Sequence, residues 1–364
     1  MRTRPWLAAV LAVVAFIFLL PVGVSAADGA DNGRMMNVLL IISDDMRTEL
    51  ATYGSALAQT PNLDRLAREG VRFDRAYCQY PLCNPSRTSM LTGRHPTTTN
   101  VYGNREYFGA THPDWVSLPK YFKQRGYVTL RSGKIFHGGI DDTEAWTEGG
   151  ERRRFGNQPS AGKPWAPAAK PVTPEEEAGR MARMLQADLR QAPHSDRGQP
   201  LEGPEEEDGD YRTTNRAIGF LRKYQDSEQP FFLAHGVSRP HSPLIAPQRF
   251  FDLYNIDDIK LPPDFAPRPT VPDGFPAGSI RMSTADLFIG REATPEQARE
   301  MIRAYLACVS HADWNIGRVL ANWTHSACAR APSSSSGATM AINWERRANG
   351  QRRGRCGSRA RGCR

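Results

Sequence analysis

Cysteine is scarce in this sequence: the chain of 364 residues contains six. Their spacing has neither the close pairs of a structural zinc site nor the regular framework of a small disulfide-stabilised domain, so both classes are excluded. The cysteines are Cys78, Cys83, Cys308, Cys328, Cys356 and Cys363. Each isolated cysteine is therefore interpreted by the chemistry of the residues around it.

Long apolar runs are absent after the N-terminus, which excludes a later membrane span. At the N-terminus, two arginines precede an apolar run over residues 6–20, and residues 24–26 place small side chains before a cleavage point. This order predicts a secretory signal peptide over residues 1–26 rather than an anchor, because the run is short for a bilayer. We expect an exported protein, periplasmic or extracellular, with no transmembrane anchor after cleavage.

Internal repeats are also absent, and the length suits one large domain or two ordinary ones. A formal charge of +8 is typical of nucleic-acid-binding proteins, but eight arginines lie between residues 346 and 364. Without these arginines the chain is near neutral. We therefore expect no nucleic-acid partner.

Strand and helix signals alternate along the chain. Continuous or alternating apolar runs predict strands at Asn37–Ile42, Val71–Tyr77, Gly126–Leu130 and Phe231–Ala234. Helices are predicted from Pro61 to Gly70, from Pro85 to Leu91, at a segment ending in Tyr121–Gln124, from Thr213 to Tyr224, and from a capping box at Thr294–Gln297 to about Leu320. Residues 148–210 predict surface loops with one short helix around Ala178–Leu189. The alternation indicates an α/β fold with a mostly parallel sheet flanked by helices.

Polar residues follow three of the predicted strands directly. They are Asp44 and Asp45, the segment from Lys134 to His137, and the stretch from His235 to His241. Ligands of such sheets bind beyond the carboxyl ends of the strands, so this repetition predicts an active site there. Adjacent carboxylates suit a hard cation, although a bare Asp-Asp pair is more often a turn or a helix cap.

The segment Cys83-Asn84-Pro85-Ser86-Arg87, followed by Met90-Leu91-Thr92-Gly93-Arg94, resembles the signature of type I sulfatases at every defining position. The resemblance implies an alkaline-phosphatase/sulfatase-like fold and a formylglycine at position 83, made from Cys83 by a formylglycine-generating maturation enzyme. It also implies that Arg87 orients the formylglycine diol, and that Asp44, Asp45 and the residue-83 oxygen bind Ca²⁺, with Mg²⁺ as the alternative. A helix N-terminus favours an oxyanion at this position.

Two further segments resemble the iduronate-2-sulfatase-like branch of the family. Gly133-Lys134-Ile135-Phe136-His137 implies that Lys134 binds a sulfate oxygen and that His137 hydrogen-bonds the diol. The stretch from residue 235 to 243 places His241 at the sulfate, where it assists the leaving group. The resemblance covers the N-terminal part of a sulfatase catalytic domain, residues 35–320, and implies a sulfated carbohydrate substrate. Two alternatives stay open: a phosphonate or phosphate ester hydrolase of the same superfamily, and a non-catalytic pseudoenzyme.

The family pattern breaks after Leu320. A complete sulfatase has another strand, which ends in an Asp-His or Asp-Asn pair that completes the cation site, and a second active-site lysine. Instead, residues 321–364 form a basic tail in which we expect no strand, only disorder, so the fold is expected to be incomplete at the C-terminus. We also expect the chain as written to be inactive, because Ca²⁺ normally takes about six to eight oxygen ligands.

The tail leads to the hypothesis of a reading-frame shift near residues 320–322. When the third base of each codon is joined to the first two of the next, Asn322-Trp323-Thr324 forces Leu-Asp and Met340-Ala341 forces Gly. Asn343-Trp344-Glu345 likewise forces Leu-Gly. With permitted codons, residues 331–352 become TIVVVWGDHGHQLGETGEWAK: a buried strand, the missing Asp-His pair and a downstream lysine. The alternative is a genuine basic tail.

Overall fold

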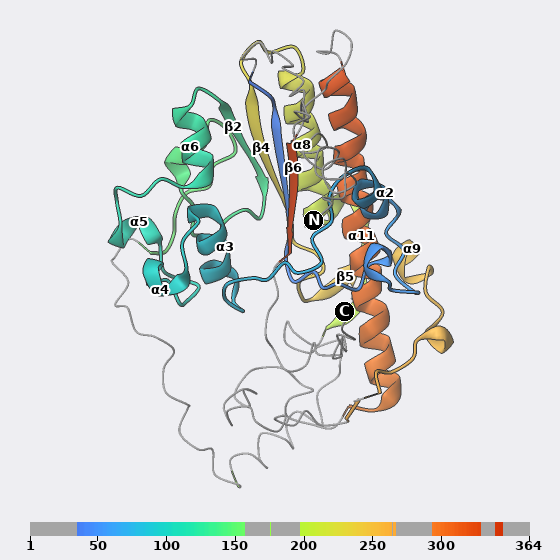
Figure 1. Cartoon of the computed structure of the whole chain (residues 1–364). Helices are drawn as coiled ribbons and strands as arrows, with labels where there is room; N and C mark the ends of the chain where they lie inside the picture. The colour runs from blue at the N-terminus through green and yellow to red at the C-terminus, as the bar shows by residue number, and fades with distance from the viewer. Residues whose placement is uncertain are drawn as a thin grey trace, which may run out of the picture. The chain divides into compact units, whose positions relative to one another are not determined.

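A parallel four-stranded sheet lies at the centre of the computed structural model (Figure 1). Its order is β2 (Val128–Gly133), β4 (Phe231–Val237), β1 (Val38–Ser43) and β6 (Thr339–Trp344). All three neighbouring pairs run parallel, so the carboxyl ends of the four strands meet at one edge.

The structure describes residues 35–156, 175, 197–263, 265–266, 293–328 and 339–344. The predicted signal peptide, the predicted helix around residues 178–189 and most of the basic tail lie outside these residues. Apart from Met35, the described residues belong to the unit that begins at Met36. Within the described ranges, no helix combines the length and the apolar character needed to cross a bilayer.

Three of the four predicted strands are confirmed. Each continues past its apolar run toward the carboxyl edge, because main-chain pairing extends to Ser43↔Val237 and Gly133↔Gly236. Strand β4 is buried along its whole length, as expected of a strand covered on both faces. The apolar runs therefore located the strands, and pairing extended them into the polar segments.

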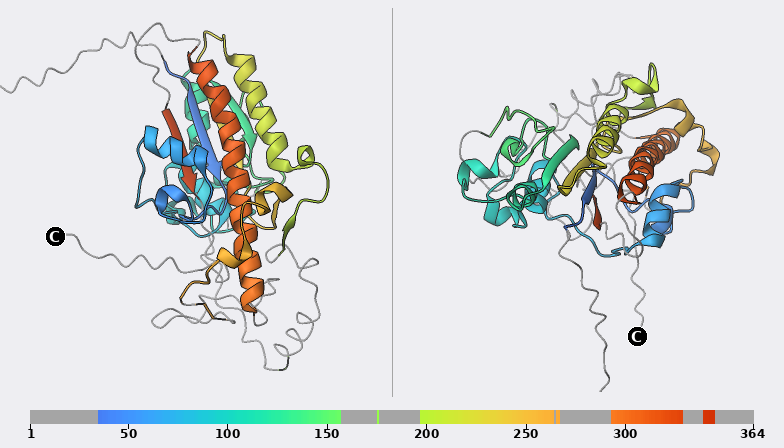
Figure 2. Two further views of the ribbon diagram at one scale, coloured as in Figure 1. Left: turned by 90° about the vertical axis from the view of Figure 1, so that its right-hand side faces the viewer. Right: turned by 90° about the horizontal axis from the view of Figure 1, so that it is seen from above.

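Helices cover both faces of the sheet (Figures 1 and 2). On one face lie α8 (Gly209–Tyr224), α11 (Pro295–Cys328) and α2 (Pro61–Glu69), and on the other lie α3 (Cys83–Thr92), α5 (Phe108–Thr111) and α6 (Leu118–Gln124). The remaining described elements are η1 (Ala51–Tyr53), α4 (Pro96–Thr99), η2 (Thr143–Ala145), β3 (Gly198–Pro200), η4 (Glu205–Glu207), β5 (Leu244–Ala246), α9 (Gln248–Phe251) and η5 (Ile256–Asp258). Strands β3 and β5 form a separate parallel pair. The predicted α/β class is confirmed.

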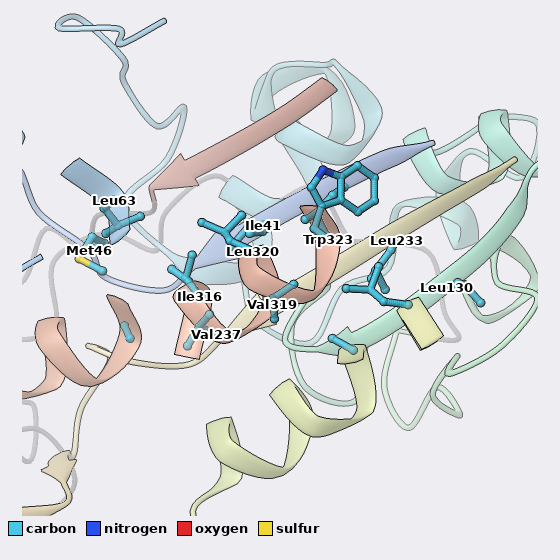
Figure 3. Close-up of a cluster of buried hydrophobic side chains, with 14 of the residues drawn as sticks. Ile41, Met46, Leu63, Leu130, Leu233, Val237, Ile316, Val319, Leu320 and Trp323 are labelled. Atoms are coloured by element: carbon cyan, nitrogen blue, oxygen red, sulfur yellow. The ribbon is translucent and has the colours of Figure 1, made fainter. Parts of the chain in front are cut away.

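Helix α11 packs on the sheet through an apolar stripe. Ile316, Val319, Leu320 and Trp323 point toward Ile41 of β1 and its neighbours (Figure 3). Their i, i+3, i+4, i+7 spacing places them on one helical face, and this stripe forms the core contact. The stripe continues to Trp323, and the helix extends past the predicted end at Leu320 to Cys328.

The predicted capping box at the start of α11 is confirmed. The Thr294 N–H donates to Gln297 Oε1 at 3.1 Å, and the Gln297 N–H donates to Thr294 Oγ1 at 3.2 Å. This reciprocal pair satisfies two N–H groups that a helix start leaves without an internal partner.

The predicted strand at Val71–Tyr77 is wrong. Residues 71–77 form no strand, and Val71, Phe73 and Tyr77 are 82%, 72% and 79% exposed. An alternating pattern predicts a strand only if another strand is available to pair with it. Within the described part of the chain, the sheet is built from β1, β2, β4 and β6 without this segment.

The expectation of no strand after Leu320 is wrong, and two elements extend into this part of the chain. Helix α11 continues to Cys328, and β6 pairs with β1 from Val38↔Thr339 to Ser43↔Trp344. The edge of β1 offers unpaired main-chain groups, which a segment rich in Thr, Ile and Trp can satisfy. Strand β1 therefore has a partner on each side.

Asp313 of α11 caps a neighbouring helix and predicts a pH effect. Its carboxylate accepts the N–H groups of Leu63 at 2.8 Å and Asn62 at 3.3 Å, at the start of α2. Burial raises the pKa of Asp313 from 3.8 to about 6 although these bonds oppose it. The folded state therefore holds the proton more tightly, and the contribution of Asp313 to stability declines as pH rises from 3.8 to about 6.

Comparison with Asp313→Asn isolates this effect, because asparagine does not titrate. Between about pH 4 and about pH 7, the unfolding free energy of the wild type is expected to fall by roughly 2 kcal/mol relative to the variant. Urea unfolding at the two pH values measures the difference. A difference that stays constant with pH would show that Asp313 does not titrate in this window.

Candidate active site

The carboxyl ends of the strands bring the predicted site residues together. Asp44 and Asp45 follow β1, Lys134 follows β2, and Cys83 begins α3 beside the same edge (Figure 1). The Asp44 N–H donates to the Val237 carbonyl at 3.2 Å, which continues the ladder into the polar segment. Parallel pairing therefore fixes the backbone from which these side chains project.

A close approach of two strand ends requires glycine. Gly133 has φ 75°, and a Cβ added there would lie 2.0 Å from the Gly236 carbonyl oxygen. A Cβ added at Gly236 would lie 2.0 Å from the Lys134 carbonyl oxygen. Since any larger residue would push β2 and β4 apart, the two glycines set the position of Lys134.

Cys83 lies at the centre of the site, 1% exposed. Its Sγ is 3.7 Å from each carboxylate oxygen of Asp44 and 3.9 Å from Lys134 Nζ. Lys134 Nζ also donates to Asp44 Oδ2. As the first residue of α3, Cys83 lies where the helix dipole favours negative charge.

Asp44 is fully buried among positive groups. Burial acts to raise its pKa, but Arg87, Lys134 and His241 together outweigh burial and hold the pKa below its ordinary value. Arg87 Nη2 lies 3.7 Å from Asp44 Oδ2. Asp44 is thus an ionised carboxylate at neutral pH, ready to bind a cation.

Arg87 also connects α3 to the end of β2. Its Nη1 donates to the carbonyls of Lys134 at 2.5 Å and Ile135 at 2.8 Å. The side chain is fully buried, so this guanidinium fixes the distance between the helix that carries Cys83 and the loop that carries Lys134.

Asp45 and His241 face each other across the site. Asp45 has φ 59°, and its Oδ2 lies 4.0 Å from His241 Nε2. His241 Nδ1 lies 2.5 Å from the Ser242 carbonyl, an acceptor, so Nδ1 is the donor. His137 lies half-buried on the loop that follows β2, close in sequence to Lys134.

Three of these residues could hold a metal ion. The ligand atoms of Asp44, Cys83 and His241 all lie within 4.8 Å of one another. The donor set fits a cation because Asp44 is ionised and buried and Asp45 adjoins it. A sulfur donor suits soft metals, whereas an oxygen at position 83 would suit Ca²⁺ or Mg²⁺.

Two residues that hold the site in shape were not predicted from sequence. Tyr305 of α11 accepts the Arg47 N–H at 2.8 Å through its hydroxyl and donates to the Asp45 carbonyl at 3.1 Å. Asp210 of α8 accepts the N–H groups of Ser238 at 2.7 Å and Arg239 at 2.8 Å, in the loop that leads to His241.

The sequence contained a signal only for Asp208, the cap of the helix that carries Asp210. Asp208 precedes α8 as a cap, accepting the Asp210 N–H at 2.8 Å, and an Asp-x-Asp pair before an amphipathic helix predicts such a cap. Nothing in the sequence indicates that Asp210 or Tyr305 binds a distant loop.

His235, to which the sequence assigns no role, lies in the core on β4. It is fully buried, and burial lowers the pKa of His235 to about 4. Its Nε2 lies 3.4 Å from Thr214 Oγ1 of α8. A neutral histidine packed between strand and helix is structural.

Removing the Tyr305 hydroxyl is expected to weaken cation binding. Tyr305→Phe leaves the Arg47 N–H and the Asp45 carbonyl without this bond, at a cost of about 1–3 kcal/mol. Tyr254→Phe is the matched control, because the buried Tyr254 hydroxyl also has two partners, the Gln59 N–H and Ser310 Oγ. Urea unfolding should show similar losses, whereas calcium titration should show weaker binding only for Tyr305→Phe. Equal calcium affinities in the two variants would contradict the assigned role.

Known proteins resemble this chain over the part that contains the site. The family model described as Sulfatase matches residues 36–327. The chain is 33% identical over 310 residues to iduronate 2-sulfatase of Mus musculus, covering 81% of this chain and 52% of that protein. It is 35% identical over 296 residues to a sulfatase of Formosa agariphila, covering 78% of this chain and 54% of the relative. The chain thus spans about half the length of these curated relatives.

The fold has solved counterparts. The phosphonate monoester hydrolase SpPMH from Silicibacter pomeroyi superposes with a TM-score of 0.57 at 19% identity, covering 86% of this chain and 64% of that chain. At this identity the similarity concerns the fold alone, and it confirms the predicted alkaline-phosphatase/sulfatase-like architecture.

Proposed function

Since the chain belongs to the sulfatase family, we propose that its site performs sulfuric ester hydrolysis on a sulfated glycan. One observation carries the proposal: Cys83 begins a helix and contacts both the ionised Asp44 and Lys134. A nucleophile at this point has a positive helix end, an ammonium group and a cation-binding carboxylate around it. That combination suits attack on a charged tetrahedral ester.

The nucleophile in this proposal is a formylglycine made from Cys83 by a maturation enzyme. Its hydrated form supplies one hydroxyl that attacks sulfur and a second that releases sulfate by restoring the aldehyde. Lys134 binds a sulfate oxygen, and His137 hydrogen-bonds the diol. His241 assists the leaving group, and the hydrogen of its Nδ1 is directed to the Ser242 carbonyl.

The cation in this proposal is Ca²⁺, with Mg²⁺ as the alternative, bound by Asp44, Asp45 and the residue-83 oxygen. It supplies charge that lowers the pKa of the attacking hydroxyl and stabilises the charge of the transition state. Arg87 keeps Asp44 ionised and holds α3 against β2. Lys134 already contacts Asp44, so a bound cation would compete with the ammonium group for this carboxylate.

We further propose that a shifted reading frame near residues 320–322 separates this chain from its complete form. The forced Gly and Leu-Gly of the shifted frame support this proposal, since they fall at the expected places beside the Asp-His pair that permitted codons give, and a sulfatase cation site needs that pair. We call the protein translated in the shifted frame the frame-restored chain. Export through the signal peptide of residues 1–26 belongs to the same proposal.

An aryl sulfate and an aryl phosphonate monoester distinguish the proposed activity from its superfamily alternative. The frame-restored chain, matured with the formylglycine-generating enzyme, is expected to hydrolyse the sulfate faster under identical conditions. Preferential hydrolysis of the phosphonate would favour the alternative. Binding of a sulfated glycan without turnover of either ester would indicate a pseudoenzyme.

A further inference from the structure

Four arginines gather on two loops beside the candidate site: Arg105, Arg152, Arg153 and Arg154. Arg105, Arg152 and Arg154 are exposed, and Arg153 is half-buried. We propose that these arginines form a basic rim that binds a second anionic group of the substrate, a sulfate or carboxylate on a sugar next to the reacting one. This inference rests on the proposed function and specifies its substrate as polyanionic.

The first loop is fixed to the start of the nucleophile helix. The Asn84 N–H donates to Asn104 Oδ1 at 3.1 Å, and Asn84 Nδ2 donates to the carbonyls of Gly103 and Glu106, each at 2.7 Å. Asn84 is the immediate neighbour of Cys83. Arg105 lies between the residues that make these bonds, so its backbone is anchored beside the site.

The second loop is fixed to the segment after His137. The N–H groups of Arg154 and Phe155 donate to the Gly139 carbonyl at 2.8 and 3.1 Å. Gly139 has φ 79°, and a Cβ added there would lie 2.8 Å from the Phe155 ring. The basic residues therefore lie next to the loop that carries His137. The contact at Gly139 is so close that it leaves no room for a side chain there.

The two loops also contact each other. The Arg105 guanidinium lies 5.5 Å from the centre of the Phe155 ring, and the Arg153 guanidinium lies 4.0 Å from the centre of the Tyr107 ring. Arg153 is fixed further by a bond from Nη1 to the Asp141 carbonyl at 2.9 Å. The aromatic rings thus hold two of the guanidinium groups in place, which reduces the entropy lost when an anion binds.

The carboxylates of these loops are occupied elsewhere. Glu106 accepts the Tyr102 and Gly103 N–H groups, and Glu151 pairs with the buried Arg131 at 2.7 Å. Asp142 accepts hydroxyl hydrogens from Ser117 and Tyr107. In the described part of the chain, no carboxylate forms an ion pair with Arg105, Arg152 or Arg154.

Exposed, rigidly based guanidinium groups suit planar or tetrahedral oxyanions, which they bind through two parallel hydrogen bonds. Sulfate and carboxylate groups of an acidic oligosaccharide have this chemistry and repeat along the polymer. A simple aryl sulfate has no second anion, so its binding would be independent of the rim. The rim therefore distinguishes polyanionic from monoanionic substrates.

The test is direct binding to the 364-residue chain, measured by fluorescence anisotropy with a labelled heparin hexasaccharide. The double variant Arg105→Gln/Arg154→Gln is compared with Arg216→Gln/Arg222→Gln, which removes the same charge from exposed positions of α8. Since two partly exposed ionic contacts are lost, the rim variant is expected to bind about tenfold more weakly. The α8 variant is expected to change affinity less than about twofold, because its charges act only at long range.

An equal loss of affinity in both variants, or no loss of affinity in the rim variant, would overturn the proposal that the rim binds the substrate. Binding needs no turnover, so the Cys83→Ala chain should bind the hexasaccharide as the wild type does. The proposed hydrolysis can therefore be disproved while the anion-binding role of the rim is supported, and the rim can be disproved while hydrolysis is supported. Urea unfolding of each variant confirms that the exposed substitutions leave the fold intact.

Discussion

Replacing Cys83 by alanine is expected to abolish hydrolysis of an aryl sulfate by the matured, frame-restored chain. The loss should reach at least about a thousandfold in kcat, because the nucleophile itself is removed. Alanine cannot be oxidised to formylglycine, and it offers no oxygen to a cation beside Asp44. Steady-state turnover of 4-nitrocatechol sulfate measures the effect.

Cys308 provides the matched control for this substitution. It is a buried thiol on α11, and burial raises the pKa of Cys308 to about 12. Cys308→Ala removes the same atoms from the core, so it should cost some stability and leave kcat nearly unchanged. Comparable losses of kcat in the two variants would show that Cys83 acts through packing rather than chemistry.

Restoring the reading frame is expected to produce the second large effect. The 364-residue chain should turn over 4-nitrocatechol sulfate at least about a thousandfold more slowly than the frame-restored chain, because its cation site lacks the Asp-His pair. Calcium titration should show the same order, with markedly tighter binding by the restored form. Both forms are matured with the same formylglycine-generating enzyme.

Two results bear on the frame proposal in opposite ways. Replacing the restored Asp-His pair by two alanines should return turnover to the level of the 364-residue chain, which ties the gain to the cation site. Robust turnover by the 364-residue chain itself would contradict the predicted inactivity. Genomic sequencing across the codons of residues 318–351 tests whether the frame is a property of the gene.

Much of the sheet could be predicted from sequence, since buried parallel strands have continuous apolar sequences. The runs at β1, β2 and β4 are of this kind, and each strand lies where its run predicted. The strand prediction for residues 71–77 was wrong because an alternation of apolar and polar residues does not show whether a partner strand is available. Strand β6 was not predicted because a partner strand, β1, was available although the local sequence showed no strand pattern. Its pairing depends on the main-chain edge of β1, which the local sequence does not indicate.

The site shows the same division. Asp44, Cys83, Lys134 and His241 were predicted from motifs. The fold brings them together because three of them follow strands that end at one edge and Cys83 begins α3 beside that edge. Tyr305 was not predictable, because it binds the Asp45 carbonyl across a sequence separation of 260 residues. A bond to a backbone group imposes no motif on its partner, so only the folded structure identifies such positioning residues.

Every chemical step proposed for the site depends on formylglycine at position 83, and the mass of one peptide reveals whether it is present. Trypsin releases residues 76–87, which contain both Cys78 and Cys83, from protein made in cells with the formylglycine-generating enzyme. We expect an aldehyde at residue 83 and an alkylated thiol at Cys78 in the same peptide. Two alkylated cysteines, in cells that convert the corresponding peptide of an active sulfatase, would contradict it.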